Sequence, residues 1–303
     1  MATEKIGNVL IVDDEAIIRE MLQIELDEEY NVFTAEDAST AFDVLRENSI
    51  DLVISDINMP GMLGFELLRK VKEDYPESKT ALITAYNVND YIRMAKENDI
   101  SNIISKSIPF NFDEFDSFVR NLVTEQIFGL EHYMLPDYEI LGEYTILSSD
   151  VISEVENSII EIISTFTKAE PLINIILEEL ITNAIYHAPV DEDGKEKYIK
   201  HSKVKLDESE AVKICLGKDS EKYGVSVLDT SGKLTKERAL FKIDRHIHGE
   251  GLLDEDGRGL HMSRIYSDRF ILNIKKNKAT EAIFLNYLNK KYKGSKPLYI
   301  NEI

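Results

Sequence analysis

Three short apolar runs near the start of the chain end in acidic or hydroxyl side chains, and a lysine comes after them. They are VLIVDD at 9–14, LVISD at 52–56 and LIT at 82–84, followed by Lys106. Such runs predict buried parallel strands, whose carboxyl ends meet at one edge of a sheet. We therefore expect Asp13, Asp14 and Asp56 to lie close together. Thr84 and Lys106 should lie beside them. Neighbouring carboxylates repel one another unless a cation joins them, and oxygen ligands suit Mg²⁺. This combination predicts transfer of a phosphoryl group onto a carboxylate.

Strand and helix patterns alternate along residues 1–125. The predicted strands are 9–13, 31–35, 52–56, 80–84 and 102–106, and an amphipathic helical pattern follows each of them. This alternation predicts an α/β domain with a doubly wound, five-stranded parallel sheet of the flavodoxin-like pattern. The elements would hold the acidic residues and the lysine at the strand ends.

In these motifs, residues 1–125 resemble the receiver domain of two-component response regulators. VDDE contains the acidic pair, DINMPG contains Asp56, and Thr84-Ala85 and Lys106 follow in order. The resemblance implies that a partner sensor histidine kinase phosphorylates Asp56, and that Thr84 and Lys106 contact the incoming phosphoryl group. It also implies a set of Mg²⁺ ligands, which are Asp13, Asp14, Asp56 and Asn58.

Two positions depart from the receiver pattern. Ile103 stands where receivers usually carry a tyrosine or phenylalanine, and Ser107-Ile108 separate Lys106 from Pro109. Both departures concern how a receiver passes its signal on, whereas the residues that would handle the phosphoryl group are all present. A receiver fold that has lost phosphorylation is the alternative.

Residues 126–144 form a predicted connector. Gly129, Pro136 and Gly142 exclude one long helix. His132 lies here, but the long helical hairpin that a histidine kinase needs for its phosphorylated histidine is missing from this stretch. We therefore interpret His132 as a loop residue and disfavour a hybrid histidine kinase.

Polar residues recur every four positions in the segment LINIILEELITNAIYHA, residues 172–188. Glu179, Asn183 and His187 share one face of the predicted helix, opposite an apolar stripe. A glutamate and an asparagine one turn apart can hold Mg²⁺ and position a reacting hydroxyl group. A solvated helix face is the alternative.

Three later blocks favour a binding site. GVSVLDTSG (224–232) predicts a strand that ends in Asp229 and a turn with Gly232. A long polar loop follows at 242–260, and its glycines open a helix at LHMSRIYSD, which is a pattern suited to binding phosphate. FILNIKKNKATEAIFLNYL (270–288) predicts a β-hairpin. We expect an α+β sandwich with a mixed sheet over residues 145–303.

In this order the blocks resemble the GHKL ATPase superfamily, and most closely its anti-sigma-factor serine kinases. The resemblance implies ATP and Mg²⁺ as cofactors, with Glu179 as general base toward a serine and Asn183 as a Mg²⁺ ligand. Asp229 would accept the adenine amino group. Further nucleotide-binding positions are His187, Gly232, Gly257, Gly259 and Thr280. Ser231 departs from the pattern, which often has glycine two residues after the aspartate.

Composition limits the function classes. The 303 residues suffice for two domains with separate cores. A formal net charge of -21 argues against a nucleic-acid-binding output, which usually shows a basic face. Cys215, the single cysteine, lies in an apolar run typical of a core and has no partner for a disulfide. With no apolar run of membrane length and no signal-peptide pattern, we expect a cytoplasmic protein without membrane or nucleic-acid partners.

The sequence thus predicts a response regulator whose output is an ATP-dependent serine protein kinase. Its substrate would be a STAS-type anti-anti-sigma protein. The alternative is a binding module that sequesters a sigma factor or its antagonist without transferring phosphate. The related kinases commonly dimerise, so a homodimer is a further expectation.

Overall fold

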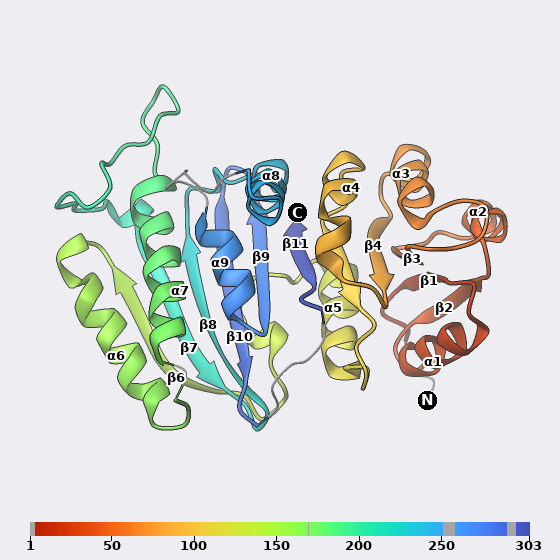
Figure 1. The fold of residues 1–303 in the computed structure, drawn as a ribbon, viewed down its shortest axis with the longest axis horizontal. Coiled ribbons are helices and arrows are strands. Elements are labelled where there is room, and N and C mark those ends of the chain that lie inside the picture. The colour runs from red at the N-terminus through yellow and green to blue at the C-terminus, as the bar shows by residue number, and fades with distance from the viewer. Residues whose placement is uncertain (1–3, 169, 251–257, 290–294) are drawn as a thin grey trace. The chain divides into compact units, whose positions relative to one another are not determined.

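The computed structural model describes four stretches of the chain, which are residues 4–168, 170–250, 258–289 and 295–303 (Figure 1). The chain divides into two compact units. Unit 1 contains residues 1–127 and 297–299, and unit 2 contains residues 128–296 and 300–303. Among the described residues, we find no helix with the length and apolarity that crossing a membrane requires.

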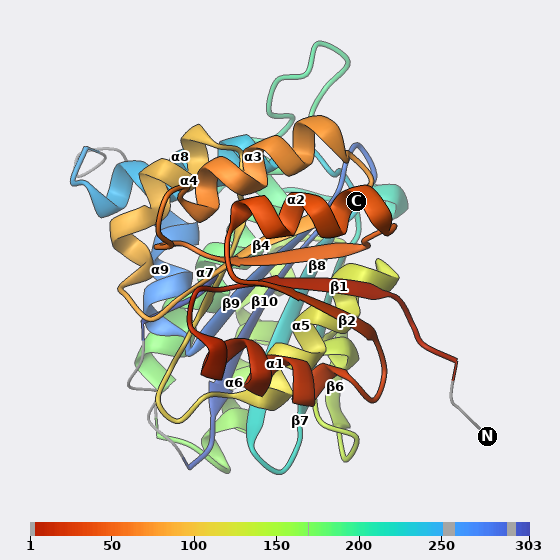
Figure 2. The ribbon, with the colours of Figure 1, turned by 90° about the vertical axis from the view of Figure 1, so that its right-hand side faces the viewer.

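Unit 1 is a parallel sheet with helices on both faces. Its strands are β1 (Asn8–Val12), β2 (Asn31–Ala35), β3 (Leu52–Asp56), β4 (Lys79–Thr84) and β5 (Asn102–Ser105). Its helices are α1 (Ala16–Leu26), α2 (Ala38–Glu47), α3 (Gly64–Asp74), α4 (Ile92–Glu97) and α5 (Phe112–Thr124). The strand order is β2-β1-β3-β4-β5, and each neighbouring pair is parallel. In Figure 2, α1 and α5 lie on one face and α2, α3 and α4 on the other. The predicted flavodoxin-like fold is confirmed.

Local sequence explains these elements. Every residue of β3 is buried, as expected for a central strand covered on both faces. Helix α2 begins after Asp37, whose side chain accepts a hydrogen bond from the Thr40 amide. Helix α5 begins in the same way after Asn111, whose side chain accepts from the Glu114 amide.

A short segment near the chain end belongs to unit 1, although the sequence assigned it to the C-terminal domain. Within β11 (Leu298–Glu302), Leu298 and Tyr299 pair antiparallel with Ile103 and Asn102 of β5. The Tyr299 hydroxyl donates to Glu114 Oε1 at 2.7 Å. The segment therefore covers an edge of the sheet that would otherwise expose backbone hydrogen-bonding groups.

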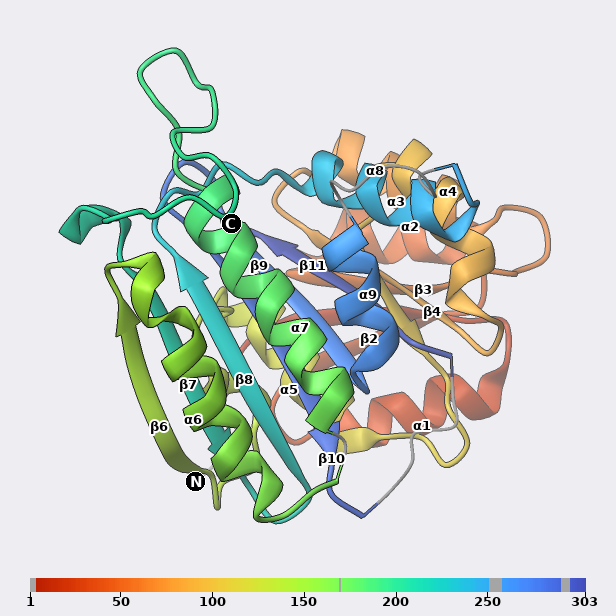
Figure 3. The same cartoon turned by 60° about the vertical axis from the view of Figure 1, so that its left-hand side comes forward.

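Unit 2 combines an antiparallel set of strands with helices on one face. Its strands are β6 (Glu139–Ile146), β7 (Val212–Lys218), β8 (Lys222–Asp229), β9 (Arg269–Lys275) and β10 (Ala279–Tyr287). They pair in the order β6-β7-β8-β10-β9, and these four pairings are antiparallel. The predicted hairpin is β9–β10 and is confirmed. The helices of unit 2 are α6 (Ile152–Ser164), α7 (Glu170–Thr182), α8 (Lys236–Ile247) and α9 (Arg258–Tyr266). Helices α6, α7 and α9 cover one face of these strands in Figure 3.

Two segments differ from the sequence prediction. Part of the predicted polar loop at 242–260 is helical, because α8 extends to Ile247 and buries Leu240 and Ile243. Much of the predicted connector belongs to unit 2, since residues from 128 onward pack there and residues 139–146 form β6. The amide of Gly129 donates to Glu281 Oε2 at 3.0 Å, which fixes the start of this segment.

Candidate functional site

Lys106 joins two buried carboxylates at the carboxyl edge of the parallel sheet. Its Nζ atom lies 2.6 Å from Asp13 Oδ2 and 2.6 Å from Asp56 Oδ1. Asp13 follows β1, Asp56 ends β3 and Lys106 follows β5, so the strand order brings all three to one edge. Asp13 is fully buried and Asp56 is 7% exposed. We call these three residues the Lys106 cluster.

The other predicted residues of this edge have different surroundings. Asp14 is exposed and lies outside the Lys106 cluster. Thr84 is fully buried, and its Oγ1 accepts a hydrogen bond from the Tyr86 amide at 3.1 Å. The amide of Asn58 donates to Asp56 Oδ2 at 2.6 Å. The two carboxylate oxygens of Asp56 thus have different partners, an amide and the Lys106 ammonium group.

Burial and charge act against each other in the Lys106 cluster. Burial raises the pKa of Asp13, and the Asp56 charge adds to this, although Lys106 and the Glu15 amide lower it. Burial by itself would lower the pKa of Lys106, but its bonds to Asp13 and Asp56 raise it above the usual value. The lysine therefore stays charged, and it is the cation that lets two carboxylates share this edge.

The oxygen atoms of this edge fit Mg²⁺ in part. The ion commonly takes one or two carboxylates and keeps several waters, and Asp13 and Asp56 provide such a pair. Within the described stretches, no group of three or more His, Cys, Asp or Glu side chains is arranged to hold a metal ion. The role of Asp14 as a Mg²⁺ ligand stays a prediction.

Replacing Asp13 by asparagine should stabilise unit 1 at neutral pH. Because burial raises the pKa of Asp13, the folded state binds more protons than the unfolded state, and stability falls as pH rises above about 4. We expect Asp13→Asn to be more stable than the wild type at pH 7 and to lose this advantage near pH 4. Hydrogen exchange of the β1 amides measures the stability of unit 1 alone. The exposed Asp14→Asn is the control, and a less stable Asp13→Asn at pH 7 would show that pairing with Lys106 outweighs burial.

In unit 2, α7 continues into a π-helical turn at Asn183–His187. Such turns occur often at functional sites. Glu179 and Asn183 both face the start of α9, because a Cβ atom on Gly259 would lie 2.6 Å from Glu179 Oε2 and 3.0 Å from Asn183 Nδ2. A side chain at position 259 would therefore require the Glu179 carboxylate to move. His187 Nδ1 lies 3.0 Å from Glu196 Oε1.

Asp229 ends β8 in a buried turn. The Ser231 hydroxyl and amide donate to Asp229 Oδ1 at 2.6 Å and 3.0 Å, and the Gly232 amide lies 3.4 Å from the same atom. Gly232 has a φ of 57°, which favours glycine. Burial raises the pKa of Asp229, and these hydrogen bonds lower it. Thr280 pairs with Asp229 across the sheet, and its buried hydroxyl group also lowers the pKa of Asp229.

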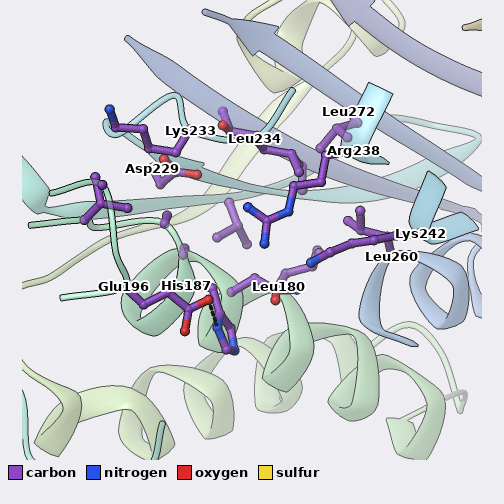
Figure 4. A pocket seen from close by; sticks show the side chains of 18 residues that line it. Leu180, His187, Glu196, Asp229, Lys233, Leu234, Arg238, Lys242, Leu260 and Leu272 are labelled. Atoms are coloured by element: carbon purple, nitrogen blue, oxygen red, sulfur yellow. Dashed lines mark hydrogen bonds and ion pairs between the residues drawn. The ribbon is translucent and has the colours of Figure 1, made fainter. Parts of the chain in front are cut away.

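A cavity of about 310 Å³ lies between these groups. Four predicted nucleotide-binding residues line it, which are Asn183, His187, Asp229 and Thr280. Glu179 and Gly259 contact each other beside Leu260, which also lines the cavity. Gly257 lies outside the described residues. We call this space the α7–α8 cavity (Figure 4).

The sequence prediction missed three cations of this cavity. Lys233 precedes α8, and Arg238 and Lys242 lie on it, one turn apart. The signal for this helix was available. Thr235 is a favourable N-cap residue, its side chain accepts from the Arg238 amide at 3.3 Å, and apolar residues follow at helical spacing.

The chain was compared with known proteins. Residues 9–119 match the family described as response regulator receiver domain. Sporulation initiation phosphotransferase F of Bacillus subtilis is 35% identical over 121 residues, which are 40% of this chain and 94% of that protein. Response regulator Rre1 of Synechocystis sp. is 33% identical over 39% of this chain and 52% of its own length. The solved structure of response regulator protein TrrA from Thermotoga maritima, in complex with Mg(2+)-BeF, is 38% identical, with a TM-score of 0.34 over 38% of this chain and 98% of that chain. Three of the curated relatives are much longer than the matched region, and the chain spans 9%, 26% and 52% of their lengths.

Proposed function

The chain belongs to the response regulator receiver family through residues 9–119, and on this premise we propose that phosphorylation of Asp56 controls an ATP-dependent output in unit 2. Receiver domains are phosphorylated on an aspartate and take the phosphoryl group from sensor histidine kinases. The observation that carries the first half of the proposal is the Lys106 cluster. The α7–α8 cavity carries the second half.

Asp56 is the proposed phosphoryl acceptor. One of its oxygens attacks phosphorus, an oxygen–phosphorus bond forms, and the bond between phosphorus and the donor's histidine nitrogen breaks. Lys106 lies 2.6 Å from Asp56 Oδ1 and would neutralise the phosphoryl charge. Thr84 would donate its hydroxyl hydrogen to a phosphoryl oxygen. Mg²⁺, when bound, supplies further charge neutralisation. Its proposed ligands are Asp13, Asp14, Asp56 and Asn58.

ATP is the proposed ligand of the α7–α8 cavity. The motifs of unit 2 resemble those of GHKL ATPases, and Asn183, His187, Asp229 and Thr280 line one cavity. Asp229 and Thr280 pair across the sheet and both line the cavity, which places an acceptor and a hydroxyl group side by side. Asp229 would accept the adenine amino group there. Asn183 would ligate the Mg²⁺ that accompanies the phosphates.

The proposed reaction transfers the γ-phosphoryl group of ATP to a serine of a STAS-type anti-anti-sigma protein. Glu179 lies next to Asn183 and Gly259 and would take the proton of the serine hydroxyl group. The serine oxygen would attack the γ-phosphorus of ATP, and ADP would leave. The resemblance to anti-sigma-factor serine kinases supports this substrate class.

Labelled phosphate transfer tests the proposal. The full chain is incubated with Mg²⁺, γ-labelled ATP and STAS-domain proteins, with and without acetyl phosphate as donor for Asp56. We expect label on a partner serine, at a rate that acetyl phosphate changes. Partner binding without label would instead identify unit 2 as a sequestering module. If acetyl phosphate does not change the rate of label transfer, the result would contradict control by the receiver.

Ser231→Ala should weaken ATP binding by about fivefold. The Ser231 hydroxyl donates to Asp229 Oδ1 at 2.6 Å and so orients the carboxylate that would receive the adenine amino group. Losing one such hydrogen bond typically costs about 1 kcal/mol. Calorimetric titration with ATP measures the change, and the exposed Ser153→Ala on α6 serves as control. Unchanged affinity would show that the amides at 231 and 232 orient Asp229 without the hydroxyl.

A further inference from the structure

Residues 128–138 follow the first stretch of unit 1 directly in the chain and lie against strands of unit 2. We call this segment the strap. Its short helical turn, Leu130–Tyr133, begins after Gly129, whose φ of 107° favours glycine. Leu130 is 1% exposed and packs on Gly224 of β8, where a Cβ atom would lie 2.8 Å from Leu130 Cδ1. The strap is therefore a packed part of unit 2.

Two opposite residues of the β9–β10 hairpin hold the two ends of this turn. Glu281 and Asn273 pair across the hairpin, and both are buried. Glu281 Oε2 accepts from the Gly129 amide at 3.0 Å, and Asn273 Oδ1 accepts from the Tyr133 hydroxyl group at 3.0 Å. Asn273 Nδ2 donates to Glu281 Oε2 at 3.1 Å and so joins the two contacts. Hydrogen bonds of buried polar groups are costly to lose, so the turn is firmly bound to the hairpin.

The strap has further contacts toward β7. The Leu135 amide donates to Asp219 Oδ2 at 2.8 Å, and Lys222 Nζ lies 2.8 Å from the same oxygen. Tyr138 covers Gly217 of β7, where a Cβ atom would lie 2.2 Å from Tyr138 Cε2. The strap thus contacts four neighbouring strands of unit 2, and a change in its position would alter its contacts with each of them.

The residues that hold the strap have direct chain neighbours in the lining of the α7–α8 cavity. Thr280 and Ala282 flank Glu281 on β10, and both line the cavity. Leu272 precedes Asn273 on β9 and lines it as well. Successive side chains of a strand point to opposite faces of a sheet, so one face holds the strap and the other borders the cavity. A shift of β10 or β9 would therefore act on both.

We propose that the strap transmits the phosphorylation state of Asp56 to the α7–α8 cavity, with Tyr133 and Glu281 as positioning residues. The inference rests on the proposed control of unit 2 by the receiver, and it names the route of that control. Coupling between two sites requires an element that both of them bias. The strap meets this requirement, since it is joined to unit 1 through the chain and to the cavity through β9 and β10.

Hydrogen exchange of the full chain tests the strap directly. Exchange is measured for peptides that cover residues 128–138 and β10, with Mg²⁺ and with or without acetyl phosphate. Asp56→Asn, which lacks the proposed acceptor carboxylate, is the control. We expect acetyl phosphate to change the exchange rate of the strap by at least about fivefold in the wild type and to leave it unchanged in Asp56→Asn.

Tyr133→Phe tests the coupling with a small change. It removes the hydroxyl group that donates to Asn273 and keeps the ring. The matched control is Tyr144→Phe, which removes a hydroxyl group of β6 that is hydrogen-bonded to Ser158. The measured quantity is the ratio of label-transfer rates to a STAS-type partner with and without acetyl phosphate.

We expect Tyr133→Phe to bring this ratio closer to one by about fivefold, because one hydrogen bond of the coupling route is lost. Its ATP affinity without acetyl phosphate should stay within about threefold of wild type, since Tyr133 does not line the cavity. Glu281→Gln is the second variant and should change the ratio in the same direction. Tyr144→Phe should keep the wild-type ratio.

Other outcomes separate the inference from the proposed function. If Tyr133→Phe and Glu281→Gln both keep the wild-type ratio, the strap does not transmit the signal, whereas receiver control of unit 2 stands. If Tyr144→Phe changes the ratio equally, the effect is not specific to the strap and the inference is refuted.

The exchange measurement also decides the inference when no kinase activity is found. If the wild type transfers no label, the proposed kinase fails, and strap exchange that responds to phosphorylation would still support the inference. Unchanged strap exchange in the phosphorylated wild type would overturn the inference in every case. If acetyl phosphate does not phosphorylate the wild type, receiver control and the strap's role in it fail together.

Discussion

Asp56→Asn should reduce labelling of unit 1 by acetyl phosphate to background, a loss of at least about 100-fold. The amide of asparagine is not a nucleophile toward phosphorus, so the oxygen–phosphorus bond cannot form. The change is nearly isosteric, and the side-chain oxygen can still accept from Lys106, which lies 2.6 Å from Asp56 Oδ1 in the protein. The loss therefore reports on chemistry more than on folding.

The measurement is separation of phosphorylated from unphosphorylated chains by gel mobility, with acetyl phosphate and Mg²⁺ present. Asp43→Asn is the matched control, because Asp43 is an exposed carboxylate whose ion pair with Arg46 lies at the surface. Labelling that persists in Asp56→Asn would place the acceptor elsewhere, and Asp13 would then be the first candidate. Absence of labelling in the wild type, under conditions that label a known receiver, would indicate a receiver fold without phosphorylation.

Glu179→Gln should lower phosphate transfer to a STAS-type serine by at least about 100-fold while leaving ATP affinity within about threefold. A general base commonly accounts for a factor of about 100 to 10,000 in rate, and glutamine cannot take the proton of the serine hydroxyl. Glu179 contacts Gly259 at the start of α9 but does not line the α7–α8 cavity itself, so nucleotide binding should be largely retained.

The rate is measured with γ-labelled ATP and saturating partner, and ATP affinity is measured separately by calorimetry. Glu178→Gln is the control, because it makes the same chemical change at the exposed neighbouring position of α7. Equal transfer by Glu179→Gln and the control would remove Glu179 from the mechanism. Equal loss of transfer and of ATP affinity would assign Glu179 to nucleotide binding.

The receiver edge was predictable because its information is local. Four strands of unit 1 appear as short apolar runs, and a polar residue of the site ends or directly follows each of them, namely Asp13, Asp56, Thr84 and Lys106. Parallel strands in one sheet end at the same edge. The runs that end at Asp13 and Asp56 therefore indicate that these two side chains are neighbours. Lys106 follows the fifth run in the same way. The fold class of unit 1 and the meeting of these three residues follow from that regularity.

The sequence alone also placed Asn183, Asp229 and Thr280 in one site, but only through resemblance to a family. Nothing in their spacing shows that they share a cavity, since α7, β8 and β10 are far apart along the chain. Lys242 was assigned to the predicted polar loop at 242–260, and no element was assigned to the stretch that contains Arg238. The N-cap and apolar spacing of α8 are typical of a helix, yet which wall of the cavity that helix forms depends on packing.

Two further features depend on contacts between distant residues. Lys106 binds Asp13 and leaves Asp14 exposed, because successive residues after a strand point in different directions and only one points to the lysine. Tyr299 lies beside Glu114, and its strand covers the edge of β5, a contact across 185 residues. The sequence determined the elements of this protein and the polar residues at their ends, since both follow from local pattern. Only the tertiary structure decided which of those residues are buried together, because burial and charge pairing arise from packing between elements distant in the chain.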